Sequence, residues 1–162
     1  MKIKCCELSK TNFALFGDVI GLPQKPNDPK TVQRWPNISV PDFEDGKPVL
    51  DVLYSNLRPL QVSQLEMHSN STQTFIPLGN HKFLIVVGKD IIVDKEADLK
   101  KLKAFITNGY QGLTLNAGVW HCSPMPVKEN TVFVILHRSP DIDLDSQVVS
   151  LTEEETLELN FH

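Results

Sequence analysis

The stretch EMHSNSTQTFIP, residues 66–77, decides the fold of this chain, because it has the pattern of two short strands joined by a polar turn. In an extended strand successive side chains alternate between the two faces, so Glu66 and His68 point to the same side. On the following strand Gln73 and Phe75 share one face in the same way. The pattern therefore allows a carboxylate, an imidazole and an amide to converge on one site. On this motif alone a second interpretation stays open, in which the first pair lies on the solvent side of an edge strand.

A second stretch, AFITNGYQGLTLNAGVWH at residues 104–121, places two turn-rich patches around a short strand. This stretch ends at His121, which directly follows Trp120. A single histidine in this setting is more often packed or hydrogen-bonded than a ligand. The combination of the two stretches, rather than either one alone, indicates a functional site.

Short apolar segments recur along the rest of the chain, separated by turn residues at intervals of about eight to twelve positions. This pattern is typical of a β-sandwich or barrel, and the eleven prolines and eight glycines fall mostly between the segments. We therefore predict one all-β domain over residues 1–162, with antiparallel strands and short peripheral helices. The predicted strands are 19–20, 49–55, 60–68, 73–78, 82–87, 91–93, 103–107, 112–115 and 131–137, with helices at 9–16 and from Thr152, which has the capping-box spacing to Glu155.

Composition excludes several classes of protein. Sixteen Lys and Arg against twenty Asp and Glu give a net charge of −4, without a basic run that could follow a phosphate backbone, so we expect no nucleic-acid partner. The longest apolar run, residues 83–87, is far shorter than the roughly 20 residues of a membrane-spanning helix. Glu7 interrupts the start before a signal peptide could form, and the three cysteines are an odd number, so we expect a cytoplasmic protein with reduced thiols.

Together the two stretches resemble the paired motifs of the cupin superfamily, in which a His-x-His followed by a carboxylate, and a later Gly-x-x-His, place metal ligands inside a small barrel. Here Glu66 takes the first His position, His68 the second and Gln73 the carboxylate position, while residues 118–121 supply the last histidine. These departures resemble one branch, the ureidoglycolate lyases, in the pattern Glu-x-His-x-x-x-Thr-Gln-x-Phe-x-Pro with Ala-Phe-Ile-Thr-Asn-Gly and Val-Trp-His. The resemblance covers most of the chain and implies a cupin-type, jelly-roll-like antiparallel β-barrel.

The resemblance also implies an activity, the cleavage of ureidoglycolate to glyoxylate and urea in allantoin breakdown, by a homodimer that acts on this small molecule. It assigns Glu66, His68, Gln73 and His121 as ligands of a divalent metal, and such a mixed set suits Ni²⁺, Mn²⁺, Fe²⁺ or Zn²⁺ without choosing among them. We expect no organic cofactor. Collapse of the substrate's carbinol carbon needs a base for the hydroxyl proton and an acid for the leaving nitrogen, so Glu66, His68 and His121 are also the candidate catalytic residues.

Three further side chains are candidates for substrate binding. Gln73 belongs to the first stretch and Trp120 precedes His121 in the second, and Arg34 is a candidate clamp for the substrate carboxylate. An arginine in a polar segment such as that around Arg34 is more often solvated.

One departure from the family lies beside the second motif. After Val-Trp-His the family commonly has one residue and then a proline, whereas here Cys122 and Ser123 precede Pro124. This expansion leaves two alternatives open: a cupin enzyme for another small hydroxy or keto acid, or a cupin that binds a small metabolite without turnover.

Overall fold

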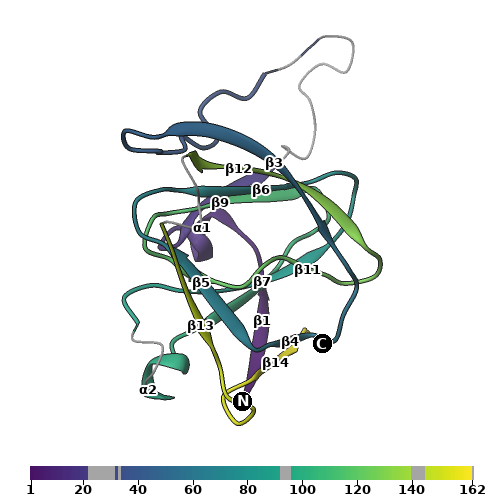
Figure 1. Ribbon diagram of the computed structural model, residues 1–162. Helices are drawn as coiled ribbons and strands as arrows, with labels where there is room; N and C mark the ends of the chain where they lie inside the picture. Colours follow the sequence, from purple (N-terminus) through teal and green to yellow (C-terminus); the bar gives the residue numbers. More distant parts are fainter. Residues whose placement is uncertain (22–31, 33, 92–95, 140–144, 162) are drawn as a thin grey trace.

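Two curled β-sheets lie one above the other in the computed structural model, which describes residues 1–21, 32, 34–91, 96–139 and 145–161 (Figure 1). The smaller sheet contains β2 (Gly17–Gly21), β3 (Lys47–Ser55), β6 (Gln73–Pro77), β9 (Gln111–Leu115) and β12 (Thr131–Ser139), in the order β2-β9-β6-β12-β3. The larger sheet contains β1 (Lys2–Glu7), β4 (Gln61–Val62), β5 (Gln64–His68), β7 (Phe83–Gly88), β8 (Lys103–Ile106), β10 (Trp120–His121), β11 (Met125–Pro126), β13 (Ser146–Ser150) and β14 (Leu157–Asn160). Its order is β13-β5-β10-β7-β8-β1-β14-β4, with β11 beside β7. This nearly all-β arrangement of curled sheets confirms the expected cupin-type barrel.

The expectation that all strands are antiparallel needs one correction. Strand β1 runs parallel to both of its neighbours, with Cys5 opposite Ala104 of β8 and Lys2 opposite Glu158 of β14. Parallel neighbours need a long connection between them, and here the partners are far apart in the sequence. Local alternation carries no information about such pairings, so the sequence pattern could not predict them.

The helices are short, as expected. Helix α1 (Lys10–Phe13) begins after Ser9, whose side chain and that of Asn12 form a capping box. Helix α2 (Glu96–Leu99) also has four residues. Neither helix, in the part of the chain that the structure describes, has the length or the apolar content to span a membrane.

The predicted helix from Thr152 is wrong, although its capping contacts exist. The backbone N–H of Thr152 donates to Glu155 Oε2 at 2.9 Å, and the N–H of Glu155 donates to Thr152 Oγ1 at 3.3 Å. These contacts close a single turn, and the chain then enters β14, where Leu157 and Leu159 are buried at alternate positions. The two-residue spacing of these leucines fits a strand, and pairing with β1 takes precedence over the local helix signal.

Two of the predicted strands also differ. The segment 60–68 is divided into β4 and β5, which pair with different neighbours. Of the segment 91–93, Ile91 lies outside any strand and the other two residues lie outside the described part of the chain.

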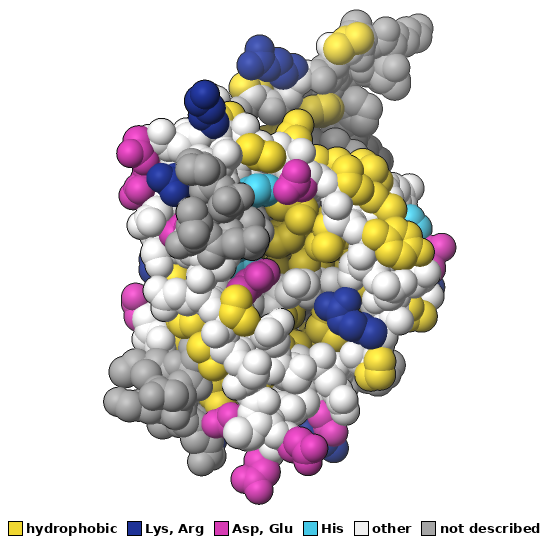
Figure 2. Space-filling view, in the orientation of Figure 1, with side chains coloured by type: hydrophobic (Ala, Val, Ile, Leu, Met, Phe, Trp, Pro, Cys, Tyr) yellow, Lys and Arg dark blue, Asp and Glu magenta, His cyan; other side chains and the backbone are white. Residues whose placement is uncertain are grey.

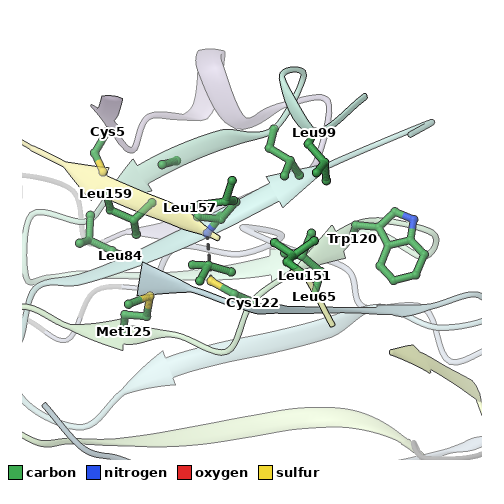
Figure 3. Packing of buried hydrophobic residues seen from close by; sticks show 14 of the residues in the cluster. Cys5, Leu65, Leu84, Leu99, Trp120, Cys122, Met125, Leu151, Leu157 and Leu159 are labelled. Atoms are coloured by element: carbon green, nitrogen blue, oxygen red, sulfur yellow. Dashed lines mark hydrogen bonds between the residues drawn. The ribbon is translucent and has the colours of Figure 1, made fainter. Parts of the chain in front are cut away.

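The central part of the larger sheet, around β7, is buried on both faces, because one hydrophobic cluster fills the space between the sheets and a second covers the outer side. Strand β7 contributes to both: Phe83, Ile85 and Val87 belong to the inner cluster, and Leu84 and Val86 belong to the outer one. The outer cluster is closed by residues of β4 and β14 (Figure 3). Strand alternation therefore decides which residues reach the barrel interior.

Candidate functional site

Three strands bring the predicted metal ligands together. Strand β5 carries Glu66 and His68, β6 carries Gln73, and β10 carries His121. His121 lies directly opposite Glu66 in the antiparallel β5–β10 pair, so their side chains leave the same face of the sheet. The neighbouring residues Leu65 and Trp120 belong to the outer cluster, as alternation requires.

A glycine of the second motif locks the two motifs together. Gly118 has φ of +77°, a left-handed conformation that favours glycine, although a Cβ atom there would meet no neighbour within 4 Å. In this conformation its N–H donates to the carbonyl oxygen of His68 at 2.7 Å. The Gly-x-x-His spacing thus connects the backbones that carry His68 and His121.

The turn between β5 and β6 is held by a buried carboxylate from the start of β13. Asp145 accepts from the backbone N–H of Ser69 at 3.1 Å and of Asn70 at 3.0 Å, and from the hydroxyl of Ser71 at 3.2 Å. This turn separates His68 from Gln73. Asp145 therefore fixes the relative positions of two predicted ligands without touching either of their donor atoms.

Oxygen and nitrogen acceptors converge on the ring of His121. Its Nδ1–H donates to the carbonyl oxygen of Val119 at 3.0 Å. Its Nε2 lies 2.9 Å from Gln73 Oε1 and 3.2 Å from Glu66 Oε1. Three acceptors thus face one another when the ring is neutral, an arrangement that either a proton or a cation between them would stabilise.

His68 completes the set. Its Nδ1 lies 3.0 Å from Ser146 Oγ, and its buried Nε2 has no hydrogen-bond partner among the described residues. When Nδ1–H donates to the serine, Nε2 presents an unused lone pair. The donor atoms of Glu66, His68 and His121 lie within 4.8 Å of one another, so these residues fit a divalent cation.

The pKa shifts of two members of the cluster, Glu66 and His68, reflect this crowding. Burial alone would raise the pKa of Glu66, but the hydrogen bond to His121 and the charges of both histidines outweigh it and hold the pKa below its ordinary value. Burial, followed by the charge of His121, lowers the pKa of His68, against the opposing effects of Glu66 and Asp145. An ionised carboxylate and a neutral imidazole are the forms in which these side chains bind metals.

A pocket of about 190 Å³ opens beside this cluster. Glu66 and His121 line it together with Arg58, Cys122 and Ser123. On the face shown in Figure 2, acidic and histidine side chains lie side by side at the margin of a hollow that contains hydrophobic side chains. The carboxylate of Glu66 is the accessible end of the cluster, since its side chain is 30% exposed while that of His121 is 1% exposed.

The structure does not bring the other predicted substrate contacts to this cluster. Arg34 is exposed in the segment before β3. Trp120 is buried in the outer hydrophobic cluster, near Leu65 and Leu151 (Figure 3). Its side chain leaves β10 on the opposite face from that of His121, because the two residues are adjacent in a strand.

Three residues of the site region had no signal in the sequence. Arg58, Asp145 and Ser146 lie in or next to polar segments without a motif, and only the strand pairing brings them to the site. Pairing of Ser146 with His68 is a contact between β13 and β5, which are distant in sequence.

Comparison with known proteins gives a consistent result. A family model described as ureidoglycolate lyase matches residues 1–158. A ureidoglycolate lyase of Escherichia coli O9:H4 (strain HS) is 32% identical over 162 residues, which cover 96% of this chain and 98% of the relative. A ureidoglycolate lyase of Burkholderia mallei (strain NCTC 10229) is 32% identical over 141 residues, which cover 83% and 81%. Among solved structures, a TDP-fucose-3,4-ketoisomerase of Campylobacter jejuni aligns with a TM-score of 0.49 and 16% identity over 80% of this chain and 86% of that one. The match over nearly the whole chain shows that the protein belongs to the ureidoglycolate lyase family.

Proposed function

We propose that the protein cleaves ureidoglycolate to glyoxylate and urea, as the names of its relatives indicate for them. The observation that carries the proposal is the convergence of Glu66, His68, Gln73 and His121, of which Glu66 and His121 line a pocket. The substrate is inferred from the family, and this cluster supplies the chemical groups that the reaction needs.

The substrate is a carbinolamide, in which one carbon bears a hydroxyl, a carboxylate and a ureido nitrogen. Its breakdown removes the hydroxyl proton, forms a carbon–oxygen double bond, breaks the carbon–nitrogen bond and returns a proton to the leaving nitrogen. The carbinol oxygen becomes the aldehyde oxygen, so no water is consumed. Elimination therefore releases intact urea, whereas hydrolysis at the ureido carbonyl would release ammonia and carbon dioxide.

We assign the hydroxyl proton to Glu66. Its carboxylate is the partly exposed member of the cluster and lines the pocket, and its lowered pKa keeps it ionised at neutral pH. One of its oxygens contacts His121, and the other is the proposed proton acceptor. His121, fixed by Val119 and Gln73, orients the carboxylate.

Glu66, His68, Gln73 and His121 are the residues that would hold a divalent metal, which when bound acts as a Lewis acid toward the hydroxyl and carboxylate oxygens of the substrate. The mixed donor set suits Ni²⁺, Mn²⁺, Fe²⁺ or Zn²⁺. Proton transfer and metal binding both require that these side chains keep their relative positions. Gly118 and Asp145 hold the backbone segments that carry them.

The direct test is to incubate the purified protein with freshly prepared ureidoglycolate and to measure glyoxylate, urea and ammonia over time, with each of the four metals added in turn. We expect equal amounts of glyoxylate and urea. The change His68→Ala should abolish turnover, while His81→Ala, a half-buried histidine paired with Glu129 away from the cluster, serves as the matched control.

Other outcomes would point to the alternatives. Turnover of a different small hydroxy or keto acid, without turnover of ureidoglycolate, would assign another reaction to the same barrel. Tight binding of ureidoglycolate without products would indicate a metabolite-binding protein. Ammonia formed before urea would contradict elimination.

The proposal includes a cytoplasmic homodimer. The free thiols of Cys5, Cys6 and Cys122 agree with a reducing compartment. For the dimer, the outer face of edge strand β3 offers an apolar surface, because Leu50 is 68% and Val52 71% exposed. A two-fold partner on this face would have to bury roughly 1,200 Å² or more in total for a stable pair.

A further inference from the structure

An arginine that no motif identified lies on the wall of the pocket next to the cluster. Arg58 belongs to the connection between β3 and β4 and lines the same pocket as Glu66 and His121. Its Nη1 donates to Ser55 Oγ at 2.9 Å, and its Nη2 donates to the carbonyl oxygen of Ser123 at 3.2 Å. A longer contact of 3.5 Å joins Nη2 to the carbonyl oxygen of Pro124. The guanidinium is thus held by the expanded segment that follows the second motif.

The support under Arg58 is itself fixed. The hydroxyl of Ser55, which accepts from the arginine, donates to the carbonyl oxygen of Pro124 at 2.8 Å in a buried contact. The side chain of a long, flexible residue is therefore positioned before any ligand arrives. Such preorganisation reduces the entropy that binding would otherwise cost.

Arg58 has no acidic partner among the described residues, where it takes part in no ion pair. Its recorded contacts are to one hydroxyl and two carbonyl oxygens, and a guanidinium has five N–H donors, so at least two N–H groups are free for a ligand. Its guanidinium and the carboxylate of Glu66 line the same pocket.

We propose that Arg58 binds the carboxylate of the substrate and thereby turns the substrate hydroxyl toward Glu66. This inference rests on the proposed function, and it assigns to the protein a specificity for small 2-hydroxy acids over their neutral analogues. A guanidinium is suited to the role, since it stays charged at neutral pH and its free N–H groups can donate to carboxylate oxygens. The accessible carboxylate of Glu66 would repel an acid that has no cation beside it, so a cation in the same pocket also serves charge balance.

The same geometry explains the expansion after the second motif. Ser123 and Pro124 form the segment in which this chain has one residue more than the family commonly has, and both use their carbonyl oxygens to hold Arg58. The segment that contains the additional residue thus holds the side chain of Arg58 in place. Arg34, the clamp candidate from the sequence, is exposed and does not line this pocket.

The first experiment measures kinetics of the metal-loaded enzyme on ureidoglycolate. Arg58→Gln should raise KM about 10- to 100-fold, the effect of losing hydrogen bonds to a charged group, with a smaller change in kcat. Arg58→Lys, which keeps the charge but places its N–H donors differently, should lie between this variant and the wild type. Arg138→Gln is the matched control, because Arg138 also donates to a backbone carbonyl, that of Phe43, but lies outside the pocket.

The second experiment measures binding without turnover. Glycolate carries the hydroxyl and the carboxylate but no ureido group, and glycolamide is its neutral analogue. Calorimetry should show that the wild type prefers glycolate by about tenfold or more, and that Arg58→Gln loses most of this preference. Glycolamide affinity should be equal in the two proteins.

The two experiments separate failure of the clamp from failure of the proposed function. If the wild type does not cleave ureidoglycolate but binds glycolate through Arg58, the clamp stands and the reaction is another one. If the wild type cleaves ureidoglycolate while both Arg58 variants keep its KM within twofold, the clamp is refuted. It is equally refuted if Arg34→Gln raises KM instead, or if the wild type binds glycolate and glycolamide equally, a result that needs no variant to fold.

Discussion

Removing the carboxylate of Asp145 should destabilise the turn between β5 and β6, which supports the candidate site. Asp145→Ala eliminates an acceptor that serves two backbone N–H groups in part-buried contacts and the buried hydroxyl of Ser71, and it leaves these donors without their carboxylate. A hydrogen bond to a charged group contributes about 1.5–3 kcal/mol, and water entering the gap recovers part of the loss. We therefore expect the free energy of unfolding to fall by about 3 kcal/mol. For a chain of this length that corresponds to a Tm lowered by about 6–12 °C.

The assay is urea denaturation followed by tryptophan fluorescence, together with titration of Ni²⁺ or Zn²⁺. Because the turn positions His68 relative to Gln73, metal affinity should fall about 10- to 100-fold, as is typical when a residue that supports the ligands is removed. Asp145→Asn, which keeps one acceptor oxygen, should show about half the loss of stability. Asp45→Ala, an exposed aspartate paired with Arg138, is the control and should leave both quantities unchanged. Asp145→Ala with wild-type stability and wild-type metal affinity would refute the argument.

Three further outcomes test other parts of the molecule. His68→Ala and His121→Ala should each lower kcat/KM at least 10²- to 10⁴-fold, the usual contribution of a positioned acid, base or ligand, and near-wild-type turnover of either variant would remove it from the site. Val52→Glu should convert a dimer into a species of 18.2 kDa in light scattering, because the new charge lies in the proposed interface; a wild-type protein that already has this mass would contradict the dimer. Iodoacetamide at pH 8 should label the exposed Cys6 before Cys5, because burial and the neighbouring thiolate raise the pKa of Cys5 to about 11 and leave roughly one thiolate in a thousand; equal labelling in the folded protein would contradict this.

The strands that form the barrel interior could be predicted because their alternation is visible over four or more residues. Strands β6, β7, β9 and β12 match the predicted segments to within about two residues at either end, which is the usual uncertainty of a boundary. By contrast β10 and β11 have two residues each, too few to show any period. The position of β1 depends on two distant partners, so no local pattern predicts it.

In the candidate site, too, the residues that belong to a local motif could be predicted, and those placed by distant contacts could not. Glu66, His68, Gln73 and His121 could be predicted because their spacing within two motifs is fixed by strand geometry. Arg58 could not, since its place depends on how the connection after β3 lies against residues 123–124.

The exposed apolar surface of β3 did leave a signal, and the sequence analysis missed it. The segment VLDVLYS at residues 49–55 is apolar at successive as well as at alternate positions. Alternation sends Leu53 toward the core and leaves Leu50, Val52 and Tyr54 in solvent. An edge strand with apolar residues on both faces indicates a surface that another chain can cover.

The position of β1 has a consequence for the order in which the chain can fold. Lys2 pairs with Glu158, so one edge of β1 stays without its partner until about 150 more residues have left the ribosome. Closing so long a loop is entropically costly and gives the nascent barrel a slow final step. Until β14 has been synthesised, the β1 edge and the hydrophobic residues against which the leucines of β14 later pack are exposed to other chains. Chaperone dependence and aggregation of truncated products should therefore depend on whether residues 157–160 are present.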